Sequence, residues 1–446
     1  MTAPTDTGPA DTGPADTGPA DTGPADTGPA GTSEQAARQR DAADPGHREL
    51  FHIPPAPGGA YPETAYLAGN SLGLQPRATR GELLAELDAW AGQAVAAHLV
   101  GDRPWLPYHE PLTEPAARLI GALPAETVVM NSLTVNLHLL MVSFYRPAGD
   151  RTRILIEDHA FPSDSYAVRS QVRFHGLDPD HTVVRLAPRP GEHTLRTEDI
   201  VDYLRREGAG VALVLLGAVN YLTGELHDIP AVTAAARAAG ATVGWDLAHA
   251  AGNVQLRMHD WDADFAAWCS YKYLNAGPGA AAGVFVHQRH LGDTSLPRFE
   301  GWWSTEPATR FEMAPVSRPP ATAEAWQISN PPILSMGPVR TSLEIFDKVG
   351  MAVLRERSQR LTGYLEGLLD ALAPAVPIVT PRDPARRGCQ LSLRVASAAR
   401  RADQLRDSYG VIADAREPDI LRLAPAPLYA SYHDCWRAAT ALGDLR

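Results

Sequence analysis

Few cysteines, few lysines and no long apolar run characterise this chain. Its 446 residues include three cysteines, which lie far apart and show no CxxC spacing: Cys269, Cys389 and Cys435. They predict neither a disulfide framework nor a zinc site, and they fit a reducing cytoplasm. No apolar run is long enough to cross a membrane. The first residues lack the basic and apolar regions of a signal peptide, so we expect no export.

Basic residues are also fewer than acidic residues. The sequence has 40 Lys and Arg against 52 Asp and Glu, a formal net charge of -12, and its basic residues are scattered. This balance argues against nucleic acid as a partner, because no stripe of basic residues is available to follow phosphates. The hydrophobic fraction of 44% supports a full core, and the length predicts two structured domains.

Near the N-terminus, the unit Ala-Asp-Thr-Gly-Pro repeats from about Thr5 to Pro29. Proline and glycine in every unit leave too little apolar surface to offset the entropy of ordering, so we predict a disordered tail, to which we assign no function. We divide the chain into this tail (1–32), an N-terminal arm (33–75), a large cofactor-binding domain (76–335) and a small C-terminal domain (336–446).

Short apolar strands alternate with helices in the large domain. We expect strands at 153–156, 211–216, 242–245 and 283–286, and helices at 199–206 and 229–239. Such an alternation is typical of an α/β domain whose mostly parallel sheet is covered by helices on both faces. Past Pro338, a long helix over 341–369, a strand over 390–395 and a terminal helix predict a smaller α+β domain.

One lysine, Lys272, stands between two tyrosines just before a glycine-rich turn. A surface loop is the ordinary place for a lysine, but lysine is rare here and this one has apolar, aromatic neighbours. Burial favours the neutral amine that a Schiff-base lysine needs. Asp246 ends the strand upstream, where it either caps the next segment or pairs with a protonated pyridine nitrogen. Together, Lys272 and Asp246 predict pyridoxal phosphate as the cofactor.

Other polar segments follow strand ends, which is where parallel sheets carry their sites. Asn131-Ser132-Leu133-Thr134 opens a helix, and it either caps that helix or binds phosphate through free backbone N–H groups. Phe161 is either a loop anchor or a stacking partner for a flat ring, and His249 either fills a polar niche or lies beside the cofactor. Singly, none of these segments is specific.

Taken together, these segments resemble kynureninase, a fold-type-I hydrolase that depends on pyridoxal phosphate and is related to class V aminotransferases. The resemblance covers roughly Tyr66 to Tyr429. It rests on six segments in order: 69–74, 131–138, 161–164, 246–250, 271–275 and 329–334. It implies the fold of that superfamily, a homodimer, and a pocket to which two subunits contribute.

The resemblance also implies residue roles at the cofactor. Lys272 would form the Schiff base and carry a proton to and from the substrate Cα, Asp246 would hold the pyridinium proton, and His249 would lie beside it. Tyr271 would reach the phosphate and relay a proton. The remaining cofactor contacts would be Leu133, Thr134, Phe161, Pro162, Ser163, Asp164, Gly217, Trp302 and Asn330. Gly217 departs from the serine of the family pattern, as Leu222 and Glu225 depart from the turn that follows it.

At the substrate, Arg422 would clamp the α-carboxylate with its guanidinium fork. His98, Ser329 and Asn330 would contact the aryl end. The implied reaction is hydrolysis of the Cβ–Cγ bond of L-kynurenine, or of its 3-hydroxy derivative, to an anthranilate and L-alanine. The family acts in tryptophan catabolism, the kynurenine pathway and pyridine nucleotide biosynthesis; the sequence does not choose among these contexts or between the two substrates.

Two alternatives stay open. A cysteine desulfurase-like lyase of the same fold type would need a mobile catalytic cysteine, for which Cys389 is the only remote candidate. A non-catalytic cofactor-binding relative would be expected to have lost at least one of Lys272, Asp246 and Arg422, and all three are present.

Overall fold

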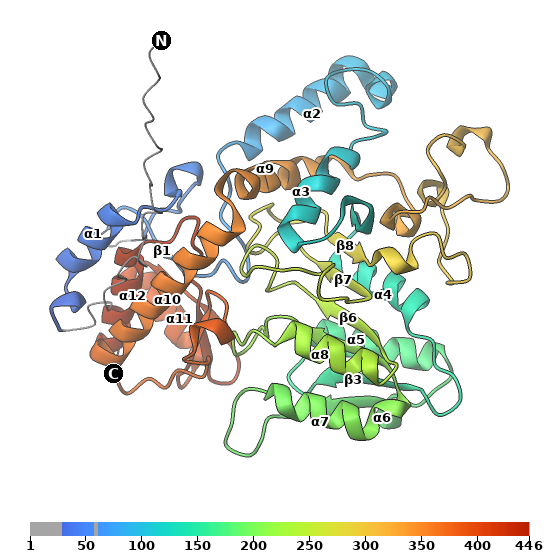
Figure 1. Cartoon of the computed structure of the whole chain (residues 1–446). Helices are drawn as coiled ribbons and strands as arrows, with labels where there is room; N and C mark the ends of the chain where they lie inside the picture. The colour runs from blue at the N-terminus through green and yellow to red at the C-terminus, as the bar shows by residue number, and fades with distance from the viewer. Residues whose placement is uncertain (1–28, 58–60, 446) are drawn as a thin grey trace, which may run out of the picture.

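The computed structural model describes residues 29–57 and 61–445. Figure 1 shows a large part built around a central sheet and a smaller part that carries both the N-terminal arm and the C-terminus. The predicted tail falls mostly outside the described residues. Its last four residues form the short 3-10 helix η1 (Pro29–Thr32), and Trp436 donates a hydrogen bond of 2.9 Å to the carbonyl of Thr32. The domain boundaries, including the end of the tail, stay predictions.

The central sheet has seven strands in the order β2-β8-β7-β6-β5-β3-β4. Their bounds are β2 Thr127–Val129, β3 Arg153–Glu157, β4 Val183–Leu186, β5 Val211–Gly217, β6 Thr242–Asp246, β7 Phe265–Trp268 and β8 Gly283–Val286. Strands β3 to β7 pair in parallel, whereas β8 is antiparallel to both β7 and β2. The mostly parallel sheet is confirmed.

Sequence reasoning missed three strands of this sheet: the three-residue β2, and also β4 and β7. β4 is half-buried along its whole length, so its apolar pattern is weak. β7 reads Phe-Ala-Ala-Trp, and alanine has a low strand propensity. β4 and β7 are four residues long, which gives little periodicity from which to recognise them.

Helices cover both faces of the sheet, as the alternation of strands and helices predicts. On one face lie α3 (Glu110–Ile120), α7 (Thr197–Glu207) and α8 (Ile229–Ala238); on the other lie α4 (Leu133–Phe144), α5 (Pro162–Phe174) and the short α6 (Pro179–Thr182). Side chains of β5 alternate accordingly: Val214 and Leu216 join the first core, Leu213 and Leu215 the second. Figure 1 shows α7 and α8 in front of the sheet.

The predicted long helix past Pro338 is in fact two helices. These are α9 (Ile333–Val349) and α10 (Met351–Leu372), and Gly350 separates them with a φ of 85°. Only glycine adopts this conformation without strain, so the chain turns at this residue. Nearer the N-terminus, the 3-10 helix η3 (Ala94–His98) directly follows α2 (Thr79–Gln93).

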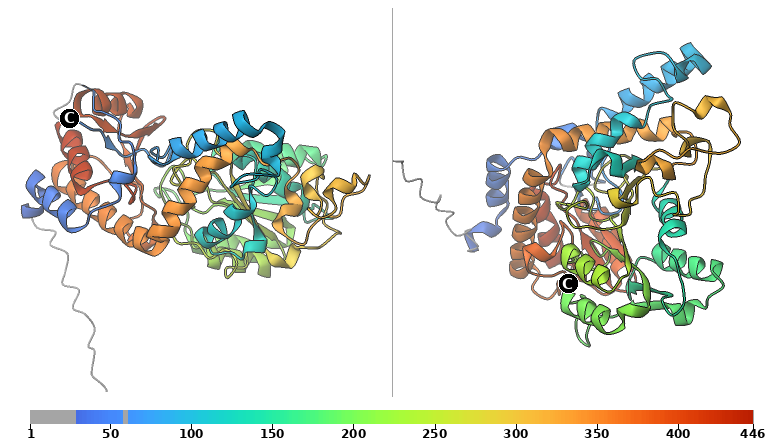
Figure 2. Two further views of the ribbon diagram at one scale, coloured as in Figure 1. Left: turned by 90° about the horizontal axis from the view of Figure 1, so that it is seen from above. Right: turned by 45° about the vertical axis from the view of Figure 1, so that its right-hand side comes forward.

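The small part packs α10 and α11 (Ala398–Tyr409) with α12 (Tyr432–Asp444) around an antiparallel sheet in the order β11-β12-β9. Its strands are β9 Leu391–Arg394, β11 Asp414–Arg416 and β12 Ile420–Leu423. The N-terminal arm joins this part through α1 (Glu34–Ala43), which packs on α12, and through β1 (Ala65–Tyr66), which pairs with β10 (Val411–Ile412). Figure 2 shows the arm and these helices side by side in both views.

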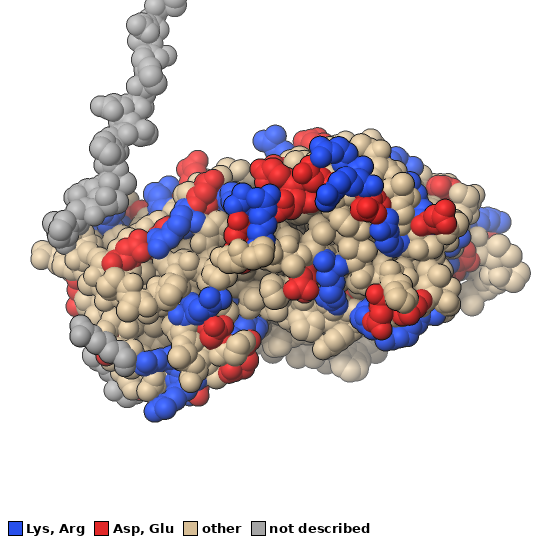
Figure 3. Space-filling model, turned by 90° about the horizontal axis from the view of Figure 1, so that it is seen from below, with Lys and Arg blue, Asp and Glu red and all other residues tan. Residues whose placement is uncertain are grey.

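Charge is mixed over the surface. Figure 3 shows basic and acidic side chains interspersed over the face seen from below. Within residues 29–57 and 61–445, no helix combines the length and the apolar character that a membrane span needs.

Candidate active site

A cavity opens where three neighbouring parallel strands end. β3, β5 and β6 finish at Glu157, Gly217 and Asp246, and the first turns of α4 and α5 and the loop after β7 close around them. The space not filled by atoms is about 680 Å³, part of it open to solvent. The lining residues are Ser132, Leu133, Thr134, Glu157, Phe161, Ser163, Asp164, Gly217, Val219, Tyr221, Asp246, Ala248, His249, Tyr271 and Lys272.

Lys272 is buried in this cavity, and its Nζ lies 3.0 Å from Nε2 of His249. Burial, and then the nearby charge of Lys272, hold the pKa of His249 well below its usual range. The imidazole is therefore neutral and can accept a hydrogen bond from the lysine amine. Its other nitrogen, Nδ1, is buried without a partner among the described residues. A buried polar atom of this kind is costly unless a ligand satisfies it.

Two carboxyl groups lie at the floor of the cavity. Burial, and then the charge of Asp246, raise the pKa of Asp164 well above its usual range, and the two side chains share a hydrogen bond. Burial also raises the pKa of Asp246, but the charge of Lys272 and the hydrogen bond with Asp164 oppose that shift. Asp164, whose pKa is raised further, is thus the protonated partner of the two and donates to Asp246. Asp246 Oδ1 also accepts from the backbone N–H of Ala248 at 2.7 Å. Asp246 therefore caps a turn and also faces the cavity, and its pairing with a pyridine nitrogen stays a prediction.

The first turn of α4 lies at another side of the cavity. Ser132 occupies the N-cap position, but its side chain makes no capping hydrogen bond. The ordinary capping interpretation thus fails for Ser132, and the first backbone N–H groups of a twelve-residue helix stay available to an anion. Thr134 Oγ1 lies 2.7 Å from Ser163 Oγ, which joins this turn to the first turn of α5.

Aromatic rings surround the amine of Lys272. Its Nζ is 5.7 Å from the centre of the Phe161 ring and 5.9 Å from that of Tyr271. Phe161 meets Tyr221 edge to face at 5.1 Å and remains 39% exposed, so one side of its ring is open. Burial, and then Cys269, raise the pKa of the Tyr271 phenol, which keeps it protonated at neutral pH. Pro162, predicted beside Phe161, begins α5 and does not line the cavity.

Arg422 lies behind the cavity on β12 and is fully buried. It donates to the carbonyl of Tyr221 at 2.7 Å, to Ser71 Oγ at 3.3 Å and to the carboxylate of Asp414. Burial, opposed by Asp414, lowers the pKa of the guanidinium. Asp414 therefore occupies the fork in this structure, and a substrate carboxylate would have to replace or share that contact.

Besides Pro162 and Arg422, four further predicted residues do not line the cavity of this chain. His98 packs edge to face on Trp105 at 5.3 Å in η3. Trp302 is 44% exposed and stacks edge to face on Phe311, while Ser329 and Asn330 are exposed. Their predicted contacts with cofactor and substrate stay predictions. All four lie on loops or a 3-10 turn that the cavity does not reach.

Glu157 and His227 are site residues that sequence reasoning missed. Glu157 lines the cavity, and its Oε2 accepts from Asn220 at 2.8 Å and lies 3.3 Å from Nε2 of His227. Burial disfavours the charge on His227, but the hydrogen bond and charge of Glu157 prevail and raise the pKa of the imidazole. An acidic residue at the end of an apolar strand, Arg-Ile-Leu-Ile-Glu, was the available signal.

The departures after β5 have structural consequences. A Cβ on Gly217 would lie 3.2 Å from Glu157 Oε1, so a larger side chain here would press on that carboxylate. Glu225 accepts from the backbone N–H of Leu195 at 3.1 Å and pairs with Arg386 at 2.6 Å. The carbonyl of Leu222 accepts from Ser392 at 2.6 Å. The contacts with Arg386 and Ser392 join the turn to the small part.

The arrangement fits pyridoxal phosphate. It offers a buried amine, an unpartnered imidazole nitrogen, a charged carboxylate for a protonated ring nitrogen and a helix N-terminus for a phosphate. The ring face of Phe161 adds a stacking surface. Lys272 is the natural attachment point, since the sequence has just one other lysine, Lys348, and that residue is exposed on α9.

Comparisons with known proteins agree with this site. Residues 354–442 match the family model described as the kynureninase C-terminal domain. The chain is 74% identical over 413 residues to a kynureninase of Salinispora tropica, an alignment that covers 92% of this chain and 96% of the relative. It is 56% identical over 413 residues to a kynureninase of Myxococcus xanthus, again with 92% and 96% covered.

Among solved structures, the fold resembles that of an apo cysteine desulfurase from Thermococcus onnurineus, with a TM-score of 0.71, 17% identity, and 86% of this chain and 94% of that chain covered. It also resembles a mutant of C-DES, which other structures describe as a cystine C-S lyase, with glycine covalently linked to its pyridoxal-phosphate cofactor. That match has a TM-score of 0.74 and 17% identity, with 89% and 99% covered. At this identity the likeness shows a shared fold.

Proposed function

Because the chain belongs to the kynureninase family, we propose that its cavity hydrolyses the Cβ–Cγ bond of L-kynurenine or 3-hydroxy-L-kynurenine. The products are anthranilate or 3-hydroxyanthranilate, together with L-alanine. It is a pyridoxal-phosphate-dependent hydrolase that acts on a carbon–carbon bond of a ketonic substrate. The observation that carries this proposal is 74% identity over 92% of the chain, with Lys272 and Asp246 both at the cavity.

Different residues of the cavity would hold the ring end and the phosphate end of the cofactor. Lys272 would bind its carbonyl carbon, Asp246 its ring nitrogen and Phe161 its ring face. Leu133, Thr134, Ser163 and Tyr271 would hold its phosphate beside the N-terminus of α4. Bound in this way, pyridoxal phosphate withdraws electrons from the Cα and Cβ of an amino acid.

The proton transfers fall to side chains of the chain itself. When the Lys272 amine is free, its Nζ can carry a proton, because neutral His249 lies 3.0 Å away and can accept a hydrogen bond from that amine. Asp246 keeps its negative charge because Asp164 donates a hydrogen bond to it, and that charge favours a proton on the ring nitrogen. The protonated Tyr271 phenol is a donor to the leaving part of the substrate.

Arg422 would bind the substrate α-carboxylate by exchanging it for Asp414. In this exchange the substrate carboxylate would compete with the Asp414 carboxylate for the guanidinium, whose charge Asp414 neutralises in this structure. The carbonyl of Tyr221, which already accepts from Arg422, would keep the fork in place during the exchange.

A homodimer would complete the site. Trp302, Ser329 and Asn330 are exposed here and do not reach the cavity of their own chain. In a two-fold dimer the same residues of the partner subunit could reach it, because an isologous interface presents each loop to the opposite chain. Trp302 and Asn330 of the partner subunit would then meet the cofactor, and Ser329 of the partner subunit, with His98, the aryl end of the substrate.

We place the enzyme in the cytoplasm, in the breakdown of tryptophan. All three cysteines are buried and unpaired, which suits a reducing compartment. The known products of the family feed either anthranilate metabolism or pyridine nucleotide synthesis, and the ratio of the two substrate activities decides which is served.

Purified protein supplied with pyridoxal phosphate tests the activity directly. Incubation with L-kynurenine should release fluorescent anthranilate and one equivalent of alanine, and kcat/KM should be measured for both kynurenines on one preparation. A few pocket contacts commonly shift such a preference by about 1–3 kcal/mol. Absence of anthranilate and of 3-hydroxyanthranilate from a fully loaded enzyme would refute the proposal.

The desulfurase alternative is tested in the same assay with L-cysteine as the substrate. We expect no sulfide, because Cys389 is fully buried and burial raises the pKa of its thiol to about 12. A thiol in that state is a poor nucleophile. Sulfide release without kynurenine cleavage would replace the proposed reaction with the alternative.

A further inference from the structure

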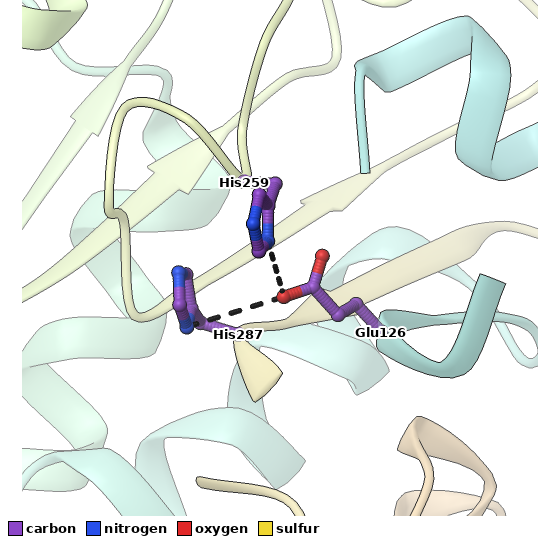
Figure 4. Close-up of side chains that lie close together, drawn as sticks. All are labelled: Glu126, His259 and His287. Atoms are coloured by element: carbon purple, nitrogen blue, oxygen red, sulfur yellow. Dashed lines mark hydrogen bonds and ion pairs between the residues drawn. The ribbon is translucent and has the colours of Figure 1, made fainter. Parts of the chain in front are cut away.

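Three side chains that can ligate a metal ion meet at the ends of the strands that lie opposite to the cavity. Glu126 precedes β2, His287 follows β8, and His259 lies in the loop between β6 and β7. Figure 4 shows both imidazoles directed toward the Glu126 carboxylate. Oε1 of that carboxylate lies 2.9 Å from Nδ1 of His259 and 3.9 Å from Nδ1 of His287. The three donor atoms all lie within 4.8 Å of one another.

The pairing of strands separates this cluster from Lys272. Trp268, at the end of β7 that leads to Lys272, pairs with Gly283 at the start of β8. Phe265, at the other end of β7, pairs with Val286, the residue before His287. The cluster and the cofactor cavity therefore lie at opposite ends of β7.

Neighbouring groups already orient the candidate ligands. Nδ1 of His287 accepts from the backbone N–H of Arg289 at 3.2 Å, which places its proton on Nε2; a metal ion at Nδ1 would have to displace this hydrogen bond, because one lone pair cannot serve both. That Nε2 lies 3.5 Å from Asp262 Oδ1. A carboxylate behind a ligating histidine in this way is the usual outer contact of a metal site. Glu126 is held too, because its Oε2 accepts from Leu123 N–H at 2.9 Å.

The charge around the cluster permits a cation. Glu126 is fully buried and its negative charge has no Lys or Arg partner among the described ion pairs. Arg289 is the nearest strong cation, but Asp262 and Asp264 bind its guanidinium.

We propose that Glu126, His259 and His287 form a binding site for one divalent transition-metal ion of the zinc type. Two imidazoles and one carboxylate suit zinc, whereas magnesium and calcium prefer an all-oxygen set. Three protein ligands would leave one tetrahedral position for water. The ion would join β2, β8 and the loop before β7, and would thereby stabilise this edge of the sheet.

Metal binding would require the Nδ1 lone pair of His287 to leave the backbone N–H of Arg289 and one imidazole ring to turn. Around a tetrahedral zinc ion, donor atoms are about 3.3 Å apart, against the 2.9 and 3.9 Å seen here. The two imidazoles stack nearly parallel, at 7° and 5.1 Å, so one of them must turn before both lone pairs meet. His259, with 27% of its side chain exposed, is the ring with room to turn, and its exposure also gives the ion a path from solvent.

The test uses the full chain loaded with pyridoxal phosphate and freed of metal by a chelator. Titration with Zn²⁺ should show one site per chain, and Mg²⁺ should not compete. At a hundredfold excess over Kd the melting temperature should rise by roughly 3 °C, a shift small enough to need the matched controls below. A crystal soaked with Zn²⁺ should show an anomalous peak among the three side chains.

Variants distinguish this site from binding elsewhere, including binding to the cofactor itself. H259Q and H287Q should each weaken zinc binding by more than the 10–100-fold that loss of an outer contact costs. His181 is the matched control, since it is an exposed histidine near a carboxylate, and H181Q should bind zinc as the wild type does. Without metal, H259Q should melt near the wild-type temperature, because its side chain is partly exposed.

Three results would overturn the proposal. These are zinc binding that is equal in wild type and H259Q, the lack of a one-per-chain site in the wild type, and an anomalous peak at another place. In each case Glu126 with its two histidines would be a purely hydrogen-bonded cluster that joins the same three segments.

Discussion

The residues proposed for the site form two groups. We call Lys272, His249, Asp246 and Asp164 the inner wall, and His98, Trp302, Ser329 and Asn330 the outer wall. The two groups differ in how completely one chain brings their members together. Lys272, His249, Asp246 and Asp164 are all buried at strand ends or just beyond them, and they contact one another directly. His98, Trp302, Ser329 and Asn330 lie on loops or 3-10 turns outside the cavity. The chemistry is thus assembled by the fold of one chain, and the outer contacts are not.

This difference has a physical origin. Inner residues follow apolar strands whose positions are fixed by a core on each face, so their backbones have little freedom. Outer residues are on segments with many exposed apolar side chains: Phe299, Trp302, Phe311, Met313 and Val316 in one loop, and Trp90, Val95, Leu99 and Val100 around η3. The proposed dimer interface would cover exposed apolar groups of this size.

Replacing Lys272 should have the largest effect. K272A removes both the attachment point and the proton carrier, so kcat for kynurenine should fall by more than about 10⁴-fold. The yellow absorption of the lysine-linked cofactor should also disappear. K348A provides a matched control, because Lys348 is the one other lysine and is exposed. Retention of yellow colour and activity in K272A would mean that the inner wall has been assigned wrongly.

The two inner carboxyl groups should differ sharply. D246N loses the charge that favours a protonated ring nitrogen, so kcat should fall about 10²–10³-fold. In D164N the amide can still donate to Asp246, as the protonated Asp164 does, so its loss should be below about 10-fold. Steady-state kinetics and cofactor absorbance between pH 6 and 9 compare the two. Equal losses would contradict the assignment of the proton to Asp164.

An outer residue should act across the subunit interface. W302A homodimers should lose activity, and so should K272A homodimers. Mixing the two under conditions of subunit exchange should restore roughly a quarter of wild-type activity, because half of the dimers are mixed and one of their two sites is intact. If mixing restores nothing although mixed dimers are detected, Trp302 serves the site of its own chain instead.

The sequence predicts the inner wall better than the outer wall for the same reason. Apolar strands and the residues that directly follow them are local patterns, and they located Asp246, Lys272 and the first turn of α4. Contacts between loops depend on which surfaces meet, and a linear pattern does not encode that geometry. Glu126 and His259 are 133 positions apart, and no ligand spacing announces their contact. The sequence shows Gly350, but apolar residues keep their helical spacing on both sides of it, so the pattern does not predict that the helix ends there.

The smallest expected effect is on the pH dependence of folding stability, and it distinguishes an inner-wall residue from an outer-wall residue without any substrate. The pKa of His249 is depressed in the folded chain, so between that value and about 6.5 the unfolded chain binds one proton more. Stability of the cofactor-free protein should therefore fall as the pH drops below about 6.5, and His249 should contribute about 1.4 kcal/mol per pH unit. Denaturant unfolding from pH 7.5 to 5.5 measures this slope.

H249Q should reduce the slope by that amount, because glutamine has no proton to gain. S329A changes the outer wall and introduces no titrating group, so it should keep the wild-type slope. Other buried histidines add their own slopes, which is why the difference between the variants, rather than the absolute slope, is decisive. An unchanged slope in H249Q would show that this imidazole is protonated in the folded state. It could then no longer accept from Lys272, and the proton path of the inner wall would have to begin elsewhere.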